Sequence, residues 1–279
     1  MILDCAGKPL DLTGPQVMGI LNATPDSFSD GGQFIAPDAA LKQAQKMVAD
    51  GAAIIDVGGE STRPGAAIVS IEEEIARVVP VIEAIQSEID IPISIDTSKP
   101  DVMRAAVNAG AGLINDVQAL RVDGALQAAV ELDVPICLMH AQGTPENMQD
   151  NPQYDAVVAE VAEFLYERVT ACEKVGINKD KLIVDPGFGF GKRASHNLRL
   201  MKHLGELVER GLPVLIGVSR KSMIGKLLNV SVEERLAASL ALSALAVWQG
   251  AKIIRSHDVR ETVQAIMMCD HVMKVEDIG

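Results

Sequence analysis

The sequence has few cysteines, and their spacing matches neither a zinc site nor a disulfide framework. The four residues are Cys5, Cys137, Cys172 and Cys269, and no two of them form a C-x-x-C motif. Zinc sites and redox dithiols depend on such close spacings. The pattern therefore predicts reduced thiols in a cytoplasmic protein, with Cys137 buried in an apolar segment.

Long hydrophobic runs are also lacking. No apolar segment approaches the roughly 20 residues that a membrane-spanning helix needs. The first residues, MILDCAGKPLD, do not show the basic and then apolar pattern of a signal peptide. We therefore expect a cytoplasmic protein that has no membrane partner.

Positive charge is scarce. The chain has 25 Lys and Arg against 38 Asp and Glu, so its formal net charge at pH 7 is −13. This balance argues against a nucleic-acid partner, because binding a phosphate backbone requires clustered cations. A few focused arginines and lysines can still bind a small anion.

What the sequence does contain is a repeated alternation of short β-rich runs and longer amphipathic runs. Eight such pairs predict a (β/α)8 TIM barrel that forms a single domain over residues 1–279, with an open doubly wound sheet as the alternative. Residues 1–13 precede the repeat, and we expect them to form a hairpin that closes the barrel floor. The predicted strands are 16–21, 53–58, 92–96, 112–115, 134–139, 181–184, 213–218 and 252–255, and the predicted helices are 37–50, 71–89, 100–109, 123–131, 153–175, 196–210, 231–248 and 258–270.

The predicted helix over 231–248 is unusual because RLAASLALSALAVWQG is apolar or small almost all the way round. A barrel helix normally buries one face and exposes the other to water. Either a neighbouring loop covers the second face, or that face is a subunit interface. We favour the interface, and a homodimer is its simplest closed form.

Polar residues follow nearly every predicted strand, where the active sites of such barrels lie. For Thr97, Ser98 and Asp258 the preferred interpretation is a helix N-cap. The other residues form a mixture that caps would not require, so we predict one shared polar site. Its members are Asn22, Asp56, Asp96, Asn115, Asp185, Lys221, Arg255 and His257.

The members of this site divide into two groups. Asp96, Asn115 and Asp185 offer mainly acceptors, which suit either a metal ion or a flat heterocycle with an amidine-like edge. The second group offers mainly donors and suits a phosphate group. It comprises Arg63, Lys221, Arg255 and His257, together with Asn22 and Thr62.

The segment DPGFGFGK resembles a phosphate-binding loop but does not match one. Its spacing is one residue short of G-x-x-x-x-G-K-[ST], and Arg193 follows the lysine. The G-x-G-x-x-G pattern is not matched either. Phe188 and Phe190 therefore have packing as the alternative to a binding role.

The segment VMGILNATPDSFSDGG passes from a buried strand directly into a polar run that carries a single aromatic residue, Phe28. In a solvated loop such an apolar ring would be exposed to water, which is unfavourable. A plain surface loop is the alternative to a binding role.

Taken together, these motifs resemble those of the dihydropteroate synthases, the folate-pathway enzymes that sulfonamides block. The resemblance covers essentially the whole chain. Pterin-binding barrels of corrinoid-dependent methyltransferases share the pocket, but the Phe28 loop and the SRKS segment favour the synthases. The matching motifs, in order, are VMGILNATPDSFSDGG, DVGGESTRPGA, SIDTSKP, NDV, LMH, DPGFGFGK, GVSRKSMIG and IIRSHDV.

The resemblance implies that 4-aminobenzoate condenses with 6-hydroxymethyl-7,8-dihydropterin diphosphate and that pyrophosphate is released. It also implies that Mg²⁺ assists the reaction and that the pterin methylene passes through a cation-like state. Asp96, Asp185, Lys221 and Arg255 would act in catalysis. The implied pterin site is Asp96, Asn115, Met139, Asp185, Phe190, Lys221 and Arg255. The implied diphosphate site is Asn22, Thr62, Arg63, Arg255 and His257, with Asn22 as the metal ligand, and the implied aminobenzoate site is Phe28, Pro64, Ser219 and Lys221.

The main alternative to an enzyme is a non-catalytic pterin-binding barrel. Such a protein would keep Asp96, Asn115 and Asp185 but would not need Phe28 or Arg63. Both residues are present, and this favours the enzyme.

Overall fold

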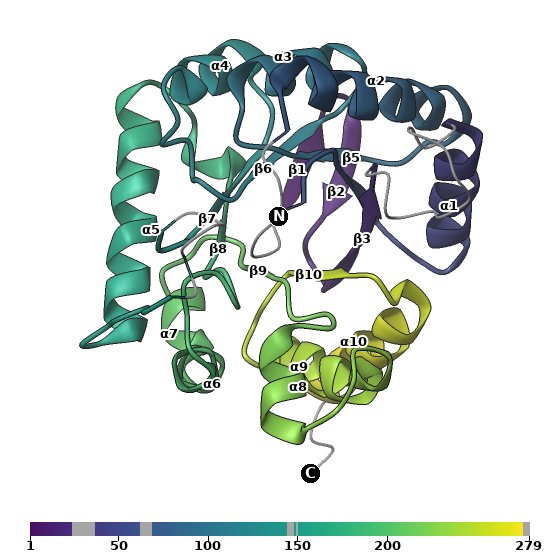
Figure 1. Ribbon diagram of the computed structural model, residues 1–279. Helices are drawn as coiled ribbons and strands as arrows, with labels where there is room; N and C mark the ends of the chain where they lie inside the picture. Colours follow the sequence, from purple (N-terminus) through teal and green to yellow (C-terminus); the bar gives the residue numbers. More distant parts are fainter. Residues whose placement is uncertain (24–36, 62–68, 144–147, 149, 276–279) are drawn as a thin grey trace.

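In the computed structural model, the structure describes residues 1–23, 37–61, 69–143, 148 and 150–275, and eight parallel strands form a barrel surrounded by helices (Figure 1). The strands lie in the order β8-β7-β6-β5-β4-β3-β10-β9. Their bounds are β3 Gln16–Asn22, β4 Ile54–Gly58, β5 Ile93–Asp96, β6 Leu113–Asp116, β7 Ile136–Met139, β8 Leu182–Asp185, β9 Leu215–Ile216 and β10 Ile253–Ser256. The predicted barrel is confirmed.

The barrel closes through a short contact between β8 and β9, the two ends of the strand order. Val184 of β8 forms a parallel bridge with Val214, which directly precedes β9. The Val184 N–H also donates to the Pro213 carbonyl at 3.0 Å. β9 itself has only two residues, so this side of the barrel has the shortest ladder among the described strands.

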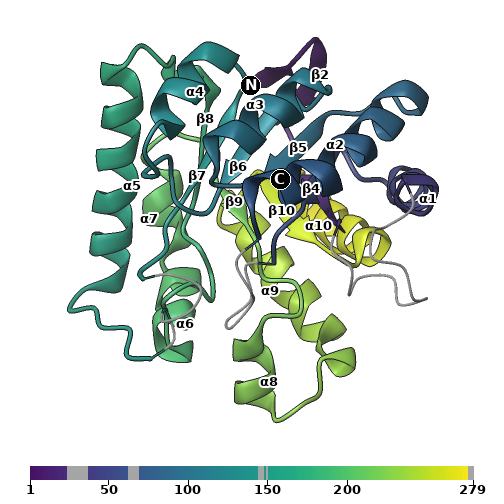
Figure 2. The same cartoon turned by 45° about the horizontal axis from the view of Figure 1, so that its top comes forward.

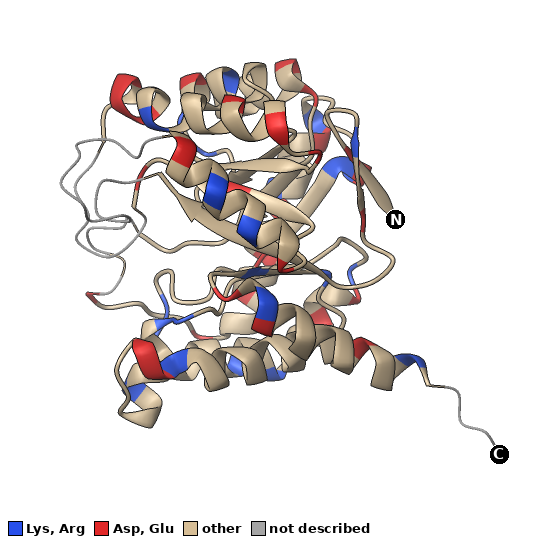
Figure 3. Cartoon of the chain, turned by 90° about the vertical axis from the view of Figure 1, so that its right-hand side faces the viewer, with Lys and Arg blue, Asp and Glu red and all other residues tan. Residues whose placement is uncertain are grey.

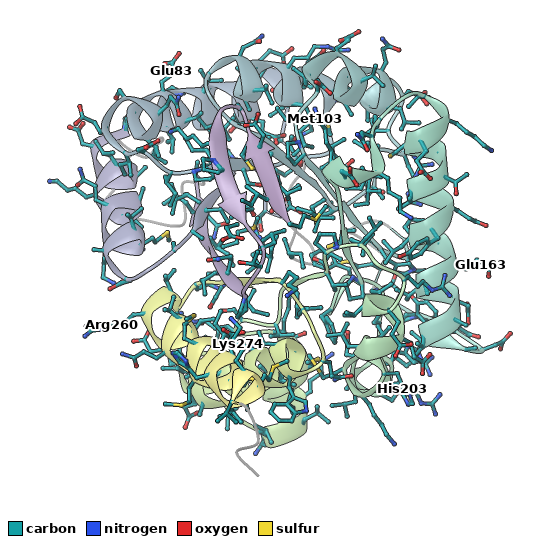
Figure 4. The ribbon with its side chains drawn as sticks, turned by 180° about the vertical axis from the view of Figure 1, so that it is seen from behind. Glu83, Met103, Glu163, His203, Arg260 and Lys274 are labelled. Atoms are coloured by element: carbon teal, nitrogen blue, oxygen red, sulfur yellow. The ribbon has the colours of Figure 1, made fainter. Side chains whose placement is uncertain are left out.

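The helices alternate with the strands and cover the outside of the barrel (Figures 1 and 2). Met103 is buried beneath α3, whereas Glu83 and Glu163 are exposed on α2 and α5 (Figure 4). These three helices therefore bury an apolar stripe and expose the opposite face, as the 3.6-residue period of the sequence requires. The bounds are α1 Pro37–Ala49, α2 Ile71–Glu88, α3 Pro100–Asn108, α4 Ala125–Leu132, α5 Val157–Lys174, α6 Ala194–Lys202, α7 Leu204–Val208, α8 Ser222–Leu228, α9 Leu236–Trp248 and α10 Val259–Lys274, with short 3₁₀ turns η2 at Lys179–Lys181 and η3 at Glu233–Arg235.

Three helix predictions need correction. The single helix predicted over 196–210 is two helices, because His203 has φ −113° and ψ 24° and so interrupts α6 before α7 begins. The segment after β9 forms α8, which the polar SRKS motif concealed. The predicted helix 231–248 starts at Leu236, since residues 233–235 form η3.

The predicted N-terminal hairpin is present and plugs the barrel floor. β1 (Ile2–Cys5) and β2 (Lys8–Asp11) pair antiparallel around a turn with positive φ at Ala6 and Gly7. The hairpin side chains Leu3, Cys5, Leu10 and Leu12 form one apolar cluster with Met18, Ile54, Leu113, Cys137, Ile183, Leu215 and Ile253 from the barrel strands. Most of these strand residues are the first of their strands, so the hairpin seals the amino-terminal end.

Charged residues of both signs are interspersed on the outer helices rather than gathered in one basic surface in the view of Figure 3. None of the helices in the described part of the chain combines the length and the apolar character that a bilayer span requires.

Candidate active site

The carboxyl ends of β4, β5, β6 and β10 bring four polar side chains into one hydrogen-bonded network. Arg255 donates from Nε to Asp56 Oδ2 at 2.6 Å and from Nη2 to Asp96 Oδ2 at 2.7 Å. The Asn115 amide donates to the same Asp56 oxygen at 3.2 Å. These residues are adjacent because parallel neighbours in register, such as Asp96 and Asn115, end at the same barrel edge.

The burial of this network shifts the pKa values of its charged groups. Burial raises the pKa of Asp96, and the Arg255 guanidinium opposes that shift. The two carboxylates raise the pKa of Arg255 further above its ordinary value, against the effect of burial. Asp56 is fully buried, and its Oδ1 has no hydrogen-bond partner among the described residues. Arg255 is thus held between two carboxylates, those of Asp56 and Asp96.

The ends of β7 and β8 form the opposite side of the mouth. Met139 and Asp185 are paired in register, and Asp185 Oδ1 accepts from the Gly187 N–H at 2.7 Å. The Lys221 Nζ lies 4.3 Å from the centroid of the Phe190 ring. All members of the predicted pterin set are described residues, and they lie at the strand ends and loops of this one mouth.

Burial also shifts the ionisation of this second side. It raises the pKa of Asp185 to about 6, although the Gly187 N–H and the Lys221 cation favour the carboxylate. It lowers the pKa of Lys221 to about 8, and the nearby Arg255 adds to this effect. The mouth therefore offers an acid and a base that both change protonation near neutral pH.

The ends of β9 and β10 meet through Ser219 and His257. The Ser219 hydroxyl and the His257 Nδ1 are 3.0 Å apart, and the His257 N–H donates to the same hydroxyl at 3.2 Å. These residues were predicted for the aminobenzoate and diphosphate sites respectively, and the structure places them side by side.

The three predicted helix N-caps do not cap by side-chain hydrogen bonds. Asp258 stands at the N-cap of α10, but its carboxylate pairs with Arg220, whose Nε lies 3.0 Å from Asp258 Oδ2. Ser98 donates to the Asp116 carboxylate instead, and α3 begins after Lys99. Thr97 Oγ1 accepts only from the Lys99 N–H, at 3.3 Å. The N-cap position of Asp258 is confirmed, although its side chain makes no hydrogen bond to the helix end. The prediction was wrong for Thr97 and Ser98, because Lys99 is the N-cap of α3.

Asn22 ends β3 and is paired in register with Gly58 of β4. A Cβ atom placed on Gly58 would lie 3.6 Å from Asp96 Cβ and 4.0 Å from Asn22 Oδ1, so the side chains of Asp96 and Asn22 both lie next to Gly58. Within the described ranges, no group of three or more His, Cys, Asp or Glu residues could hold a metal ion. An amide oxygen such as Asn22 Oδ1 fits Mg²⁺ that takes its other ligands from phosphate and water. Phe28, Thr62, Arg63 and Pro64 lie outside the described residues.

Two lysines of the site region were not predicted. Lys99 Nζ contacts Glu74 Oε2 at 2.5 Å, Glu60 Oε2 at 2.9 Å and the Val69 carbonyl at 2.8 Å. Lys192 is buried among backbone carbonyls of its own loop. In the sequence, the position of Lys99 in SIDTSKP and of Lys192 at the end of DPGFGFGK was the only signal.

This arrangement can bind a flat, polar heterocycle. Carboxylate and amide acceptors face it from Asp96, Asn115 and Asp185, and Lys221 supplies a donor. A buried carboxylate binds an amidine-like edge through two parallel hydrogen bonds.

Known proteins resemble this chain over almost its full length. The family model described as "Pterin binding enzyme" matches residues 18–257. The dihydropteroate synthase of Escherichia coli (strain K12) is 54% identical over 277 residues, which cover 99% of this chain and 98% of that protein. The Yersinia pestis dihydropteroate synthase, solved with a sulfonamide drug complex, has a TM-score of 0.94 and 51% identity and covers 99% of this chain and 100% of its own.

Two structures of the Xanthomonas albilineans dihydropteroate synthase are also similar. The one solved with 4-aminobenzoic acid has a TM-score of 0.93 and 52% identity, and it covers 99% of both chains. The one solved in complex with 7,8-dihydropteroate has a TM-score of 0.91 and 49% identity, and it covers 99% of this chain and 100% of its own.

Proposed function

The chain belongs to the pterin-binding enzymes and, among them, to the dihydropteroate synthases, and we propose that it joins 4-aminobenzoate to 6-hydroxymethyl-7,8-dihydropterin diphosphate to give 7,8-dihydropteroate and pyrophosphate. The observation that carries this proposal is the convergence of Asp96, Asn115 and Asp185 at one mouth, opposite Lys221.

The pterin would lie between the two sides of the mouth. Asp96, Asn115 and Asp185 would accept from its N–H edge, and Lys221 would donate to its carbonyl and ring nitrogen. Met139 and Phe190 would line the slot, with Arg255 stacked on the outer face of the ring. The buried position of Asp185 strengthens these bonds, because water does not compete for its oxygens.

The diphosphate would lie toward β3 and β10. Asn22, Thr62, Arg63, Arg255 and His257 would hold its oxygens, and the amide oxygen of Asn22 would bind Mg²⁺ together with the diphosphate. When bound, Mg²⁺ supplies positive charge that stabilises the departing pyrophosphate. Aminobenzoate would lie against Phe28, Pro64, Ser219 and Lys221.

The reaction needs no activated protein nucleophile. The neutral arylamine nitrogen forms a bond to the pterin methylene carbon, and the C–O bond to the diphosphate breaks with its electron pair leaving on pyrophosphate. The nitrogen then releases one proton to solvent. The electron-rich pterin can spread positive charge from its methylene, and the carboxylates of Asp96 and Asp185 favour that charge electrostatically.

The test is pyrophosphate release from the pterin diphosphate with and without 4-aminobenzoate. We expect release that depends on aminobenzoate, with 7,8-dihydropteroate formed in equal amount. A protein that binds pterin but releases no pyrophosphate under either condition would instead be a non-catalytic pterin-binding barrel.

A homodimer is a second proposal, supported by the outer faces of α9 and α10, which lie side by side (Figures 1 and 2). Leu245 and Trp248 of α9 are 51% and 57% exposed, and Met268 and Val272 of α10 are 66% and 51% exposed. Apolar patches of this kind mark protein interfaces. Light scattering should give twice the chain mass, and Trp248→Glu should give the single-chain mass, whereas Leu198→Glu on α6 should not change it.

A cytoplasmic setting is proposed from the thiols. All four cysteines are free, and three of them are buried. Reduced thiols are typical of that compartment.

A further inference from the structure

The loop between β8 and α6, which carries DPGFGFGK, folds around the ammonium group of its own lysine. Lys192 Nζ donates to the Gly187 carbonyl at 2.9 Å, the Phe190 carbonyl at 3.0 Å and the His140 carbonyl at 3.3 Å. It also lies 2.8 Å from His140 Nδ1. The side chain is 3% exposed. The lysine of a phosphate-binding loop extends toward its ligand, whereas this one turns inward.

The loop backbone is shaped to allow this. Gly187, Gly189 and Gly191 all have positive φ, at 67°, 86° and 61°. A Cβ atom on Gly187 would lie 1.9 Å from the His140 carbonyl oxygen, and one on Gly191 would lie 2.4 Å from that of Gln142. The loop is therefore pressed against the end of β7, which only glycine permits at these positions.

His140 serves as an acceptor for the lysine. Burial, and beside it the Lys192 cation, lowers the pKa of His140 to about 3, so the ring is neutral at physiological pH. Its Nδ1 can then accept a hydrogen bond from Lys192 Nζ. Burial also lowers the pKa of Lys192 to about 7, whereas the Asp185 carboxylate favours its charged form.

The groups that Lys192 holds are next to the predicted pterin contacts. Gly187 receives the Lys192 bond at its carbonyl and donates its N–H to Asp185 Oδ1. Phe190 receives the Lys192 bond at its carbonyl, and its ring lies beneath Lys221 Nζ. Lys192 Nζ is thus connected to Asp185 through Gly187 and to Lys221 through Phe190.

We propose that Lys192 is a positioning residue for the pterin slot, which acts by holding the Gly187 and Phe190 carbonyls against His140. This inference rests on the proposed function, because it takes the slot as a pterin site. Lys192 touches no reacting atom. Lys192 donates to carbonyls of its own loop instead of extending toward a bound phosphate.

The experiment compares Lys192→Met with Lys181→Met. Methionine keeps the length of lysine but leaves the carbonyls of Gly187 and Phe190 without a donor. Lys181 is the matched control because it directly precedes the same strand at its other end, where its Nζ pairs with Asp133 Oδ1 at 2.6 Å. The probe is 6-hydroxymethylpterin without a diphosphate, and its affinity is measured by calorimetry.

We expect Lys192→Met to weaken pterin binding at least about tenfold and to raise the KM for the pterin diphosphate while the KM for aminobenzoate changes little. Amide hydrogen exchange should accelerate at Gly187 and Gly189, which donate to Asp185 and Asn197, but not along β7. Lys181→Met should match the wild type in all these measurements.

Two results would overturn the inference: a folded Lys192→Met protein that binds pterin like the wild type, or equal losses for both substrates with faster exchange throughout the barrel. If Lys192→Met does not fold, His140→Phe provides the test. This change removes the Nδ1 acceptor of Lys192 and keeps an aromatic ring at that position. A selective loss of pterin affinity there supports the inference, and unchanged affinity overturns it. A wild-type protein that does not bind pterin refutes the proposed function instead.

Discussion

The two ends of the barrel use the same eight strands in opposite ways. At the amino-terminal end the hairpin residues Leu3, Cys5 and Leu10 meet the first apolar residues of the strands. At the carboxyl end the same strands finish in Asp56, Asp96, Asn115, Asp185 and Arg255, most of them buried. The two functions of the barrel therefore lie at opposite ends of its strands. The floor contributes stability through apolar burial, and the mouth contributes binding through buried charge.

The floor gives the largest expected effect on stability. Leu10→Ala removes a side chain that is 1% exposed and leaves a cavity, so we expect the free energy of unfolding to fall by about 2–5 kcal/mol. Urea unfolding measures it. The control is Ile2→Ala on the same hairpin, since Ile2 is 65% exposed and should cost little. Pterin affinity of folded Leu10→Ala should be unchanged; a parallel loss of affinity would break the separation of floor and mouth.

The mouth gives the largest expected effect on binding. Asp185→Asn keeps the shape of the side chain but places a donor where the pterin also donates, which leaves buried groups unpaired. We expect a loss of about 1–3 kcal/mol, which is roughly a 5- to 150-fold increase in the pterin dissociation constant. Calorimetry measures it. Asp180→Asn, an exposed change just before the same strand, is the control. Unchanged affinity in folded Asp185→Asn would remove Asp185 from the pterin site.

The pH dependence of pterin binding tests whether the ionised form of Asp185 is the one that binds. Burial raises the pKa of Asp185 to about 6, and the pterin needs the ionised carboxylate. Below pH 6 that carboxyl is mostly protonated before binding, so the affinity should fall by about tenfold per pH unit as the pH falls. Above pH 6 this contribution should level off. Asp185→Asn should lack this step, and an identical pH profile for the variant would assign the titration to another group.

The smallest expected effect concerns the diphosphate. Asn22→Ala should weaken binding of the pterin diphosphate in the presence of Mg²⁺ by about 1 kcal/mol or more, while binding of 6-hydroxymethylpterin stays the same, because Asn22 is proposed to contact only Mg²⁺ and the diphosphate. Competition calorimetry with both ligands measures the difference. Equal losses for the two ligands would show that Asn22 shapes the pterin slot or the fold.

The strand order and the location of the site could be read from the sequence because both depend on local patterns. All eight strands are present within one or two residues at most ends, apart from β9, which has only two residues. The strand-end residues Asp96, Asn115, Asp185 and Arg255 do lie at one mouth. Helix ends were less predictable: His203 interrupts a continuous helical pattern, and α8 is too short to show a clear period.

The partners of the polar residues could not be predicted in the same way. The sequence offered Asp258 and Ser98 as helix caps, but Arg220 and Asp116 bind them from other segments. The DPGFGFGK segment did not match a phosphate-binding loop, which left the role of Lys192 open, and the folded loop turns this lysine inward toward His140, 52 residues away.

By itself, the sequence determined the alternation of strands and helices, the barrel, its apolar floor and the set of polar residues at its mouth, because periodicity and the composition of strand ends are local properties of the chain. Only the tertiary structure decided which acid holds Arg255, which carbonyls surround Lys192 and which carboxyl titrates near pH 6. Those properties depend on burial and on distances between groups far apart in the chain, and each buried charge takes whichever partner the packing brings within hydrogen-bond reach.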